Sequence, residues 1–344
     1  MRQKTSDRPS NINQAQELMR TSLVWDNHAC MPLRPEDASF LPQLQDVRAA
    51  GIDVISLNAG FGPSGPDEHL AMLDSFTEWL DARADDYRIV LTVDDIQDAR
   101  RDGKLAVLFD VEGMAPLNGG RLDLVEDFRR RGVGWMLIAY NRQNDAGFGC
   151  YDEDGGLTGF GREVIAEMKR VGMMICCSHT GFRTAREVIE TAGAPVIFSH
   201  SNASAVDPHE RNIPDWLIDL CAESGGVIGV NGIGAFLGGT ASVTRLADHV
   251  EHIAARVGAE HVGLGLDFVF DLAELEAFLA TMRETFPDDA SFRMPVTMIH
   301  DQQITELVAE LIGRGFDTPS LKLILGGNWM RVASQVWPTR LTRT

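Results

Sequence analysis

The sequence has few cysteines, a deficit of basic residues and no long apolar run, and each of these features excludes a class of protein. Its five cysteines are odd in number and form no Cys-x-x-Cys pair, which argues against a disulfide framework or a structural zinc knuckle. The 31 basic and 50 acidic residues give a formal net charge of −19. Because such a surface repels phosphate backbones and anionic membranes, we expect neither nucleic acid nor a membrane as a partner.

No stretch approaches the ~18 apolar residues of a membrane span, and the first 25 residues lack the apolar core of a secretory signal. We therefore expect a reducing, cytoplasmic location. The apolar fraction of 44% and the charged fraction of 24% are those of a soluble globular protein. No linker rich in Pro, Gly or Ser divides the chain, so we expect one domain over residues 1–344, with residues 1–15 as a loose polar arm.

Short apolar runs alternate with amphipathic stretches along the chain. Apolar residues at helical spacing predict helices, for example over residues 68–80 and 243–257. Eight apolar or β-branched runs predict strands over residues 22–26, 53–58, 105–111, 134–140, 173–178, 195–199, 226–230 and 261–266. Eight strands that alternate with helices are typical of a (β/α)8 TIM-like barrel. Residues 271–319 then predict a C-terminal helical extension, either an insertion or a cap.

Metal-ligand residue types recur where the predicted strands end. In such barrels the carboxyl ends of the strands meet at one rim, which carries the active site. A single histidine there is more often a satisfied polar residue, but six residues of ligand type on five strand ends predict a metal site. These residues are His28, Cys30, Glu112, His179, His200 and Asp267.

These donors favour zinc or a similar divalent ion, because imidazole and thiolate are borderline-soft and a carboxylate can bridge two ions. The i, i+2 spacing of His28 and Cys30 puts both side chains on one face of a strand. Glu112 would lie between this pair and the opposite pair, His179 and His200. Together these residues would hold two ions ~3.5–4 Å apart. Such a pair lowers the pKa of a bridging water and makes it a nucleophile.

Longer stretches resemble the membrane (renal) dipeptidase family of binuclear zinc metallopeptidases, a branch of the amidohydrolase superfamily. The similarity runs from about residue 24 to residue 336. Its most specific motifs are GLTGFGREV (156–164), APVIFSHS (194–201) leading to RNIP (211–214), VGLGLDF (262–268) and LGGNWMRV (325–332).

The resemblance implies a metal-dependent dipeptidase that acts on small peptides, including L,D-dipeptides. His28 would bind the first ion, Glu112 would bridge both ions, and His179 with His200 would bind the second. Asp267 would take a proton from the attacking hydroxide and pass it to the leaving amine.

Arg211 would hold the C-terminal carboxylate of the substrate, which suits the bidentate geometry of guanidinium. Without the family, Arg211 would be interpreted as a surface ion pair.

Two positions depart from the family pattern. Cys30 stands where the family has aspartate in a His-x-Asp motif, and it is either a softer thiolate ligand or a small buried filler. Tyr140 stands where the prototype has a histidine that polarises the scissile carbonyl. Its phenol either donates a hydrogen bond to the developing oxyanion or only packs at the barrel mouth. Asn141 beside it is a further predicted substrate contact.

Two other functions stay open at this point. The first is hydrolysis of another amide, such as N-acyl amino acid deacylation. The second is a non-catalytic metal- or peptide-binding relative, against which Asp267, Glu112 and Arg211 argue, because a binding module needs no proton shuttle. Many barrels of this kind dimerise, so a homodimer also stays open, although no patch in the sequence indicates one.

Overall fold

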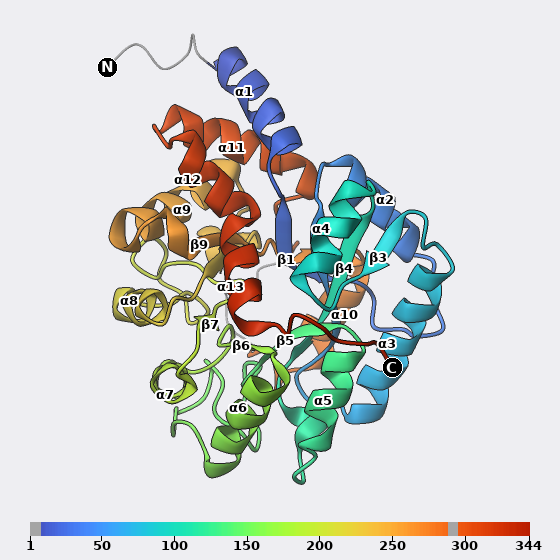
Figure 1. Ribbon diagram of the computed structural model, residues 1–344. Helices are drawn as coiled ribbons and strands as arrows, with labels where there is room; N and C mark the ends of the chain where they lie inside the picture. Colours follow the sequence, from blue (N-terminus) through green and yellow to red (C-terminus); the bar gives the residue numbers. More distant parts are fainter. Residues whose placement is uncertain (1–7, 288–294) are drawn as a thin grey trace.

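The computed structural model describes residues 8–287 and 295–344, and these form a ring of parallel strands surrounded by helices (Figure 1). The order around the ring is β7-β6-β5-β4-β2-β1-β9-β8. This confirms the predicted (β/α)8 TIM-like architecture. The ring strands are β1 (Trp25–Cys30), β2 (Val54–Phe61), β4 (Leu105–Glu112), β5 (Val133–Leu137), β6 (Met174–Cys176), β7 (Val196–Ile197), β8 (Ile228–Val230) and β9 (Val262–Leu264).

A parallel bridge between Phe198, which follows β7, and Ile228 of β8 closes the ring. Neighbouring strands elsewhere in the ring are also parallel. Two short strands that the sequence pattern does not predict pair beside it. These are β3 (Tyr87–Ile89), which pairs with β4, and β10 (Phe268–Val269), which pairs with β1.

Helices cover the outside of the barrel, and their apolar faces follow the helical period. In α9, the Ser242 side chain accepts a hydrogen bond from the Arg245 N–H at the N-terminus, and Leu246, Val250 and Ile253 are buried along one face. The α-helices are α1 (Arg8–Thr21), α2 (Leu44–Ala49), α3 (Pro66–Asp81), α4 (Val93–Arg101), α5 (Asp123–Arg130), α6 (Gly159–Val171), α7 (Phe182–Ala192), α8 (Asp215–Glu223), α9 (Val243–Val257), α10 (Leu272–Thr281), α11 (Ile304–Gly313), α12 (Thr318–Lys322) and α13 (Asn328–Val336).

Single helical turns supplement them. In the described part of the chain five of them are 3₁₀ turns, and the sixth, directly before α13, is a π-helical turn. Their bounds are η1 (Leu41–Gln43), η2 (Ala115–Leu117), η3 (Gly234–Leu237), η4 (Ala259–His261), η5 (Asp301–Gln303) and η6 (Leu323–Gly327).

The inside of the barrel changes from apolar to polar along the strands. On β4, Ala106 and Leu108 belong to the apolar cluster inside the ring. Asp110 and Glu112 continue the same alternation toward the carboxyl end of the strand. The polar end is therefore the rim at which barrels of this class carry their active sites.

Tryptophans fill the opposite end of the barrel. In α13, Trp329 Nε1 donates to the Leu264 carbonyl oxygen (3.0 Å), and Trp337, the residue after α13, donates through Nε1 to the Gly134 carbonyl oxygen (3.1 Å). Both rings share one apolar cluster with Trp25. A Cβ at residue 134 would lie 2.8 Å from the Trp337 ring, so this close approach requires glycine. We call Trp25, Trp329 and Trp337 the tryptophan floor.

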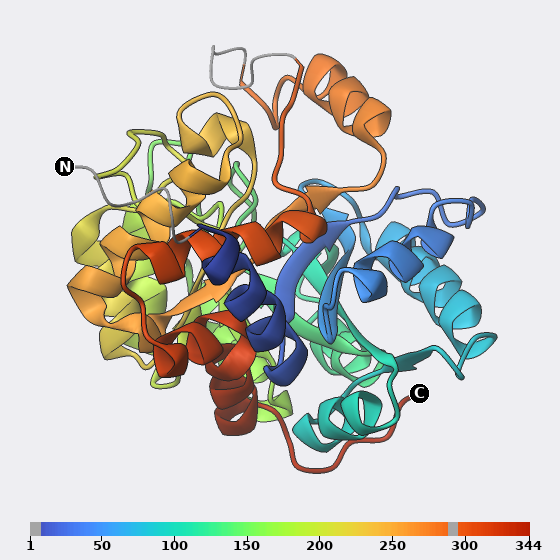
Figure 2. The same cartoon turned by 90° about the horizontal axis from the view of Figure 1, so that it is seen from above.

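Helix α10 lies at the polar end, so that α10 and α13 stand at opposite ends of the molecule (Figure 2). Ion pairs tie α10 to the loop after β1: Arg34 contacts Glu274 (2.8 Å) and Asp271 (3.0 Å). Glu274 also accepts a hydrogen bond from the Leu33 N–H (3.1 Å). The predicted extension over residues 271–319 is therefore helical. Its first helix, α10, caps the rim, whereas α11 packs beside α1 and α9, and residues 288–294 lie outside the described residues.

The structure corrects two sequence predictions near the N-terminus. The predicted loose arm is wrong for residues 8–15, because they begin α1, where Ala15 is fully buried; residues 1–7 lie outside the described residues. The first strand runs over Trp25–Cys30 rather than residues 22–26. Its second half is polar because His28 and its neighbours face the rim, so an apolar run underestimates its length.

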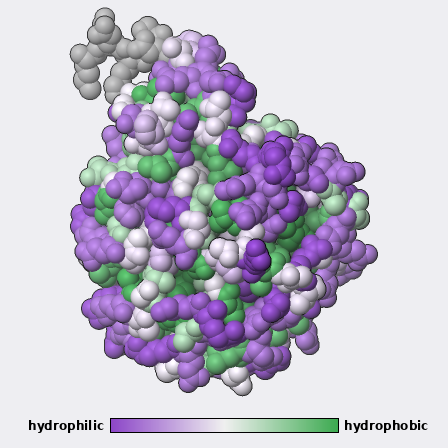
Figure 3. All heavy atoms as spheres, in the orientation of Figure 1, coloured by the Kyte–Doolittle hydropathy of each residue, from purple (hydrophilic) through white to green (hydrophobic). Residues whose placement is uncertain are grey.

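Hydrophilic side chains cover much of the face in Figure 3, with hydrophobic residues in small groups between them. Within residues 8–287 and 295–344, no helix is both long and apolar enough to cross a membrane. The large hydrophobic side chains that are exposed in this part of the chain are Trp216 and Leu323.

Candidate active site

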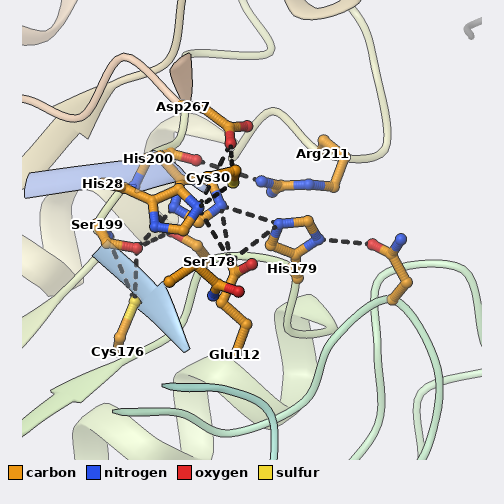
Figure 4. A network of polar contacts seen from close by, with 12 residues as sticks. His28, Cys30, Glu112, Cys176, Ser178, His179, Ser199, His200, Arg211 and Asp267 are labelled. Carbon is orange, nitrogen blue, oxygen red and sulfur yellow. Dashed lines mark hydrogen bonds and ion pairs between the residues drawn. The ribbon is translucent and has the colours of Figure 1, made fainter. Parts of the chain in front are cut away.

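The rim of the barrel brings all five predicted metal ligands and Asp267 together (Figure 4). Strand β1 carries His28 and Cys30, and β4 ends on Glu112. The other three side chains each stand three residues beyond the end of a ring strand: His179 after β6, His200 after β7 and Asp267 after β9.

Three imidazole Nε2 atoms converge on one carboxylate oxygen. Glu112 Oε1 lies 3.6 Å from His28 Nε2, 3.6 Å from His179 Nε2 and 3.3 Å from His200 Nε2. The Nε2 atoms of His179 and His200 are 2.9 Å apart. On the other side of His28, its Nε2 lies 3.5 Å from Cys30 Sγ and 3.4 Å from Asp267 Oδ1.

The outward nitrogen of each imidazole has its own partner. His28 Nδ1 contacts Asp110 (3.3 Å), His179 Nδ1 contacts Asn141 Oδ1 (2.7 Å) and His200 Nδ1 contacts the Ser199 hydroxyl (2.8 Å). Such contacts orient metal-ligating histidines and fix which nitrogen faces the ion. The three side chains are therefore preset with Nε2 directed inward.

Asp110, the partner of His28 Nδ1, is itself fixed by two hydrogen bonds. Its carboxylate accepts hydrogen bonds from the Ser56 hydroxyl (2.6 Å) and the Asn58 amide (3.0 Å). Asp110 comes from β4 and His28 from β1, so the contact between them spans the inside of the barrel.

Three residues of the site have backbone conformations that side chains other than glycine rarely adopt. Asn141, His179 and Asp267 have φ angles of 57°, 61° and 60°, and they are the non-glycine residues with positive φ in the described chain. A left-handed conformation is unfavourable for a residue with a Cβ, and such strain concentrates at functional sites. The coincidence of all three in one site supports a functional role for this rim.

The donor set fits divalent metal ions. Glu112 Oε1 is buried and forms no hydrogen bond with any described residue, although three imidazole nitrogens surround it. Potential ligand atoms form two groups, and within each group all atoms lie within 4.8 Å of one another. One group is His28, Cys30 and Asp267, and the other is His28, Glu112 and His200. Imidazole, thiolate and carboxylate donors at such spacing are those of a zinc-type site.

Burial sets the protonation states of these groups in the metal-free protein. It raises the pKa of Glu112 to about 8 and that of the Cys30 thiol to about 12. It lowers the pKa of His179 and His200 well below the usual range, so that both imidazoles are neutral and free to ligate. Ion binding to Glu112 and Cys30 must therefore displace protons.

Asp267 differs from Glu112, because its pKa is held well below the usual range. Burial opposes ionisation, but His28 and a hydrogen bond from Asn231 stabilise the charged form and outweigh it. The Asn231 amide donates to Asp267 Oδ2 over 2.9 Å. An ionised carboxylate beside the inward nitrogen atoms can accept a proton.

Arg211 lies at the wall of the cavity above these residues and is buried. It donates to the His200 carbonyl oxygen (3.2 Å), and its guanidinium lies 5.3 Å from the centre of the Phe236 ring. Its Nε atom is buried with no hydrogen-bond partner among the described residues. The side chain is therefore no surface ion pair, and it retains a donor for an anionic ligand.

Tyr140 and Asn141 reach the same cavity from the loop after β5. Tyr140 stacks on His179 with ring centroids 4.1 Å apart, and burial raises the pKa of its phenol well above the usual value. The hydroxyl thus stays protonated. Asn141 is buried, with its oxygen on His179 and its nitrogen on the Thr285 carbonyl oxygen (3.3 Å), so both ends of its amide are engaged.

Some residues of the site were not predicted from the sequence. Asp110 and Asn231 support His28 and Asp267, but their partners lie 82 and 36 residues away in the chain. Their positions in the sequence could have indicated them. Asp110 lies two residues before Glu112 on the same face of β4, and Asn231 directly follows β8.

Comparisons with known proteins place this chain in a family. The family model for membrane dipeptidase (peptidase family M19) matches residues 12–277. "Dipeptidase verJ" of Clonostachys rogersoniana is 28% identical, over 95% of this chain and 87% of that protein. "Dipeptidase 3" of Mus musculus is 32% identical over 69% of this chain, but the match spans only 46% of the mouse protein.

Solved structures agree with the fold. An amidohydrolase from Pseudomonas aeruginosa superimposes with a TM-score of 0.85 at 27% identity, over 94% of this chain and 99% of that chain. A metallo peptidase from Rhodobacter sphaeroides, bound to a phosphinate mimic of the dipeptide L-Ala-D-Ala, superimposes with a TM-score of 0.76 at 22% identity, over 92% of this chain and 100% of that chain. With a family model that covers most of its length, the chain belongs to the membrane dipeptidase family, peptidase family M19.

Proposed function

We propose that this chain is a metal-dependent dipeptidase that hydrolyses dipeptides with a free C-terminal carboxylate. The observation that carries the proposal is the convergence of three inward imidazole nitrogens on Glu112 Oε1. Asp267 lies on one side of this cluster, and Arg211 lines the cavity above it. Family membership and relatives named dipeptidases support the same activity.

The ligand assignment rests on the contacts of Glu112, whose Oε1 lies within 3.6 Å of all three imidazole Nε2 atoms, and on the contact of Cys30 Sγ with His28 Nε2 (3.5 Å). We assign His28, Cys30 and Glu112 to one divalent ion, and Glu112, His179 and His200 to the other, with zinc as the ion that these donors favour. When bound, the ions would supply Lewis-acid polarisation of the scissile carbonyl and a lowered pKa for water.

The residues around the ions divide the remaining work. Arg211 binds the substrate carboxylate, and Tyr140 donates a hydrogen bond to the carbonyl oxygen as it gains negative charge. Asp267 accepts the proton that water loses as it attacks the carbonyl carbon. It returns this proton to the amine nitrogen as the carbon–nitrogen bond breaks.

Asn141 takes a different role from the one that its sequence position indicated. Its amide oxygen is occupied by His179 Nδ1, and its amide nitrogen by the Thr285 carbonyl oxygen. We therefore propose that Asn141 is a positioning residue for His179 rather than a direct substrate contact.

One experiment tests the activity against its alternatives. The purified protein is assayed for bound metal and screened against L,L-dipeptides, L,D-dipeptides and N-acyl amino acids, with and without a chelator. The L,D-dipeptides belong in the screen because the Rhodobacter structure holds an L-Ala-D-Ala mimic. We expect chelator-sensitive cleavage of dipeptides.

Two variants sharpen this screen. Asp267→Asn keeps the shape of the side chain, so it should bind the same ions and lose at least about 100-fold in kcat. Cleavage of N-acyl amino acids alone would identify a deacylase, and metal binding without any cleavage would identify a binding protein. Either result overturns the proposal.

We also propose a single domain in a reducing, cytoplasmic setting. The five cysteines are all free thiols, as in proteins of reducing compartments. Helix α11 from the C-terminal extension buries Leu307 and Leu311 in the same apolar core as the barrel strands, which supports one folding unit. Sedimentation of the purified protein will decide between a monomer and the homodimer that barrels of this class often form.

A further inference from the structure

Aromatic rings form one side of the cavity above the metal ligands. Phe61, Tyr140, Phe278 and Phe286 line it and pack on one another. Ring centroids are 5.0 Å apart for Phe61 and Tyr140, 5.3 Å for Phe61 and Phe278, and 6.1 Å for Tyr140 and Phe286. We call these four residues the aromatic wall. Because Tyr140 also stacks on His179, the wall begins at the metal centre itself.

Arg211 reaches the cavity from the opposite side of the barrel. Phe61 ends β2, and β2 is four strands away from β7 in either direction around the ring. Arg211 lies in the loop after β7 and donates to the His200 carbonyl oxygen. The ligand cluster around Glu112 stands between the two sides. A dipeptide whose carboxylate is held by Arg211 and whose peptide bond lies over Glu112 therefore extends its first residue toward the aromatic wall.

The surface around the aromatic wall is apolar, and the carboxylate beside it, Glu274, already has partners. Leu275 and Leu279 of α10 line the cavity next to Phe278. Glu274 also lines it, but its carboxylate is held by Arg34 and the Leu33 N–H. The other carboxylates among the described lining residues, Glu112 and Asp267, belong to the metal centre. The wall thus offers apolar contact to a side chain rather than a charge.

We propose that the aromatic wall is the subsite for the first residue of the substrate, and that the enzyme prefers dipeptides whose first residue has a large apolar side chain. This inference rests on the proposed dipeptidase function and adds its substrate class. Burial of a Phe or Leu side chain in such a site favours cleavage by about 10- to 100-fold in kcat/KM over a small residue.

The test compares dipeptides that differ only in their first residue. The zinc-loaded enzyme is assayed with Phe-Gly, Leu-Gly, Ala-Gly and Asp-Gly. We expect kcat/KM for Phe-Gly and Leu-Gly to exceed that for Ala-Gly by about 10-fold or more, with Asp-Gly cleaved most slowly. If all four are cleaved but Ala-Gly or Asp-Gly is cleaved best, the inference is wrong and the dipeptidase function stands. If none is cleaved, the dipeptidase function itself fails.

Variants of Phe278 locate the preference on the wall. Phe278→Ala should lower the Phe-Gly to Ala-Gly ratio of kcat/KM about 10-fold, mainly through KM, and Phe278→Leu should restore most of it. Phe316→Ala is the matched control, because Phe316 is also partly buried but packs on the core away from the cavity. Circular dichroism of all three variants checks that they fold. An unchanged ratio in a folded Phe278→Ala protein would overturn the assignment.

Discussion

Cys30 stands where the resemblance to the family implies an aspartate, so this position offers a thiol instead of a carboxylate. Its sulfur lies 3.5 Å from His28 Nε2 and 3.6 Å from Asp267 Oδ1, inside a group of ligand atoms. A thiolate donates more charge to an ion than a carboxylate does and offers one donor atom instead of two. The first ion should therefore be held firmly but polarise its substrate less strongly.

This assignment predicts the metal content of two variants. We expect two ions per chain in the wild-type protein and in Cys30→Asp, but fewer than two in Cys30→Ala. Cobalt-loaded wild-type protein should show a thiolate-to-cobalt charge-transfer absorption that both variants lose. Cys150→Ala is the control, because Cys150 Sγ contacts Asn141 Oδ1 (3.7 Å) rather than the ligand cluster. Full occupancy and an unchanged spectrum in Cys30→Ala would show that Cys30 only fills space.

A second prediction at this scale concerns the Tyr140 hydroxyl. Tyr140→Phe removes one oxygen and keeps the ring that stacks on His179. If the hydroxyl stabilises the developing oxyanion, kcat should fall by about 100-fold while KM changes little. Steady-state kinetics with one dipeptide measure both constants. A variant that keeps the wild-type kcat would leave Tyr140 with a packing role only.

The sequence predicted the candidate ligands from their positions at strand ends: His28, Cys30 and Glu112 lie in the last residues of β1 and β4, and His179 and His200 follow β6 and β7. It did not locate the residues that orient them. The contact between His28 and Asp110 joins positions 82 residues apart, and only the closed ring brings them together. Arg211 was placed by the family resemblance, because nothing in its local sequence distinguishes a buried guanidinium from an exposed one.

At the scale of elements, periodicity predicted long helices and buried strands well. Helix α9 has the predicted bounds, 243–257, because its apolar residues keep a strict helical spacing and Ser242 caps its N-terminus. The strands β3 and β10 were not predicted because they lack a run of buried apolar residues: only Tyr87 of β3 is buried, and both residues of β10 are half-buried. Asn328, the first residue of α13, follows two glycines, and its side-chain amide donates to the Ala259 and Val262 carbonyl oxygens, contacts between distant positions that periodicity does not predict.

The ion pairs that attach helix α10 to the loop after β1 can be tested by mutation. Arg34 joins the helix to the loop after β1 through Glu274 and Asp271. In Arg34→Met we expect faster hydrogen exchange across α10 and a several-fold higher KM for Phe-Gly. The free energy of unfolding should change by no more than about 1 kcal/mol, because the side chain is one-third exposed (33%).

The control for this variant is Arg256→Met. Arg256 also pairs with two carboxylates, Asp215 and Asp219, at a similar exposure of 34%, but it lies on α9. Its loss should leave the KM for Phe-Gly and the exchange of α10 unchanged. Equal effects of both substitutions would mean that Arg34 acts on general stability and not on the cap.

For the whole molecule, the metal site and the stability of the fold depend on pH in a linked way. Burial raises the pKa of Glu112 to about 8 from an ordinary value of 4.5. Between these values the folded metal-free protein binds a proton that the unfolded chain has released. The contribution of Glu112 to the free energy of unfolding is therefore present below pH ~4.5 and is lost as the pH rises to about 8.

This linkage can be measured by denaturant unfolding of the metal-free protein at several pH values. We expect the free energy of unfolding of the wild type to fall relative to Glu112→Gln between pH 5 and 8, by at most about 1.4 kcal/mol per pH unit. Added zinc should stabilise the wild type increasingly as the pH rises, because the ion needs the ionised carboxylate. Parallel pH profiles for the two metal-free proteins would contradict the assignment.

The tryptophan floor affects how substrates enter the barrel and how products leave it. Trp25, Trp329 and Trp337 fill the barrel at the end opposite α10. The cavity above the candidate ligands lies at the other end, where Leu275 and Phe278 of α10 line it. In the proposed function, a product with a large apolar side chain leaves through this cavity and passes the aromatic wall that bound it. Tighter binding of the first residue therefore slows release of that product. For the best substrates, product release rather than bond cleavage is then expected to limit kcat.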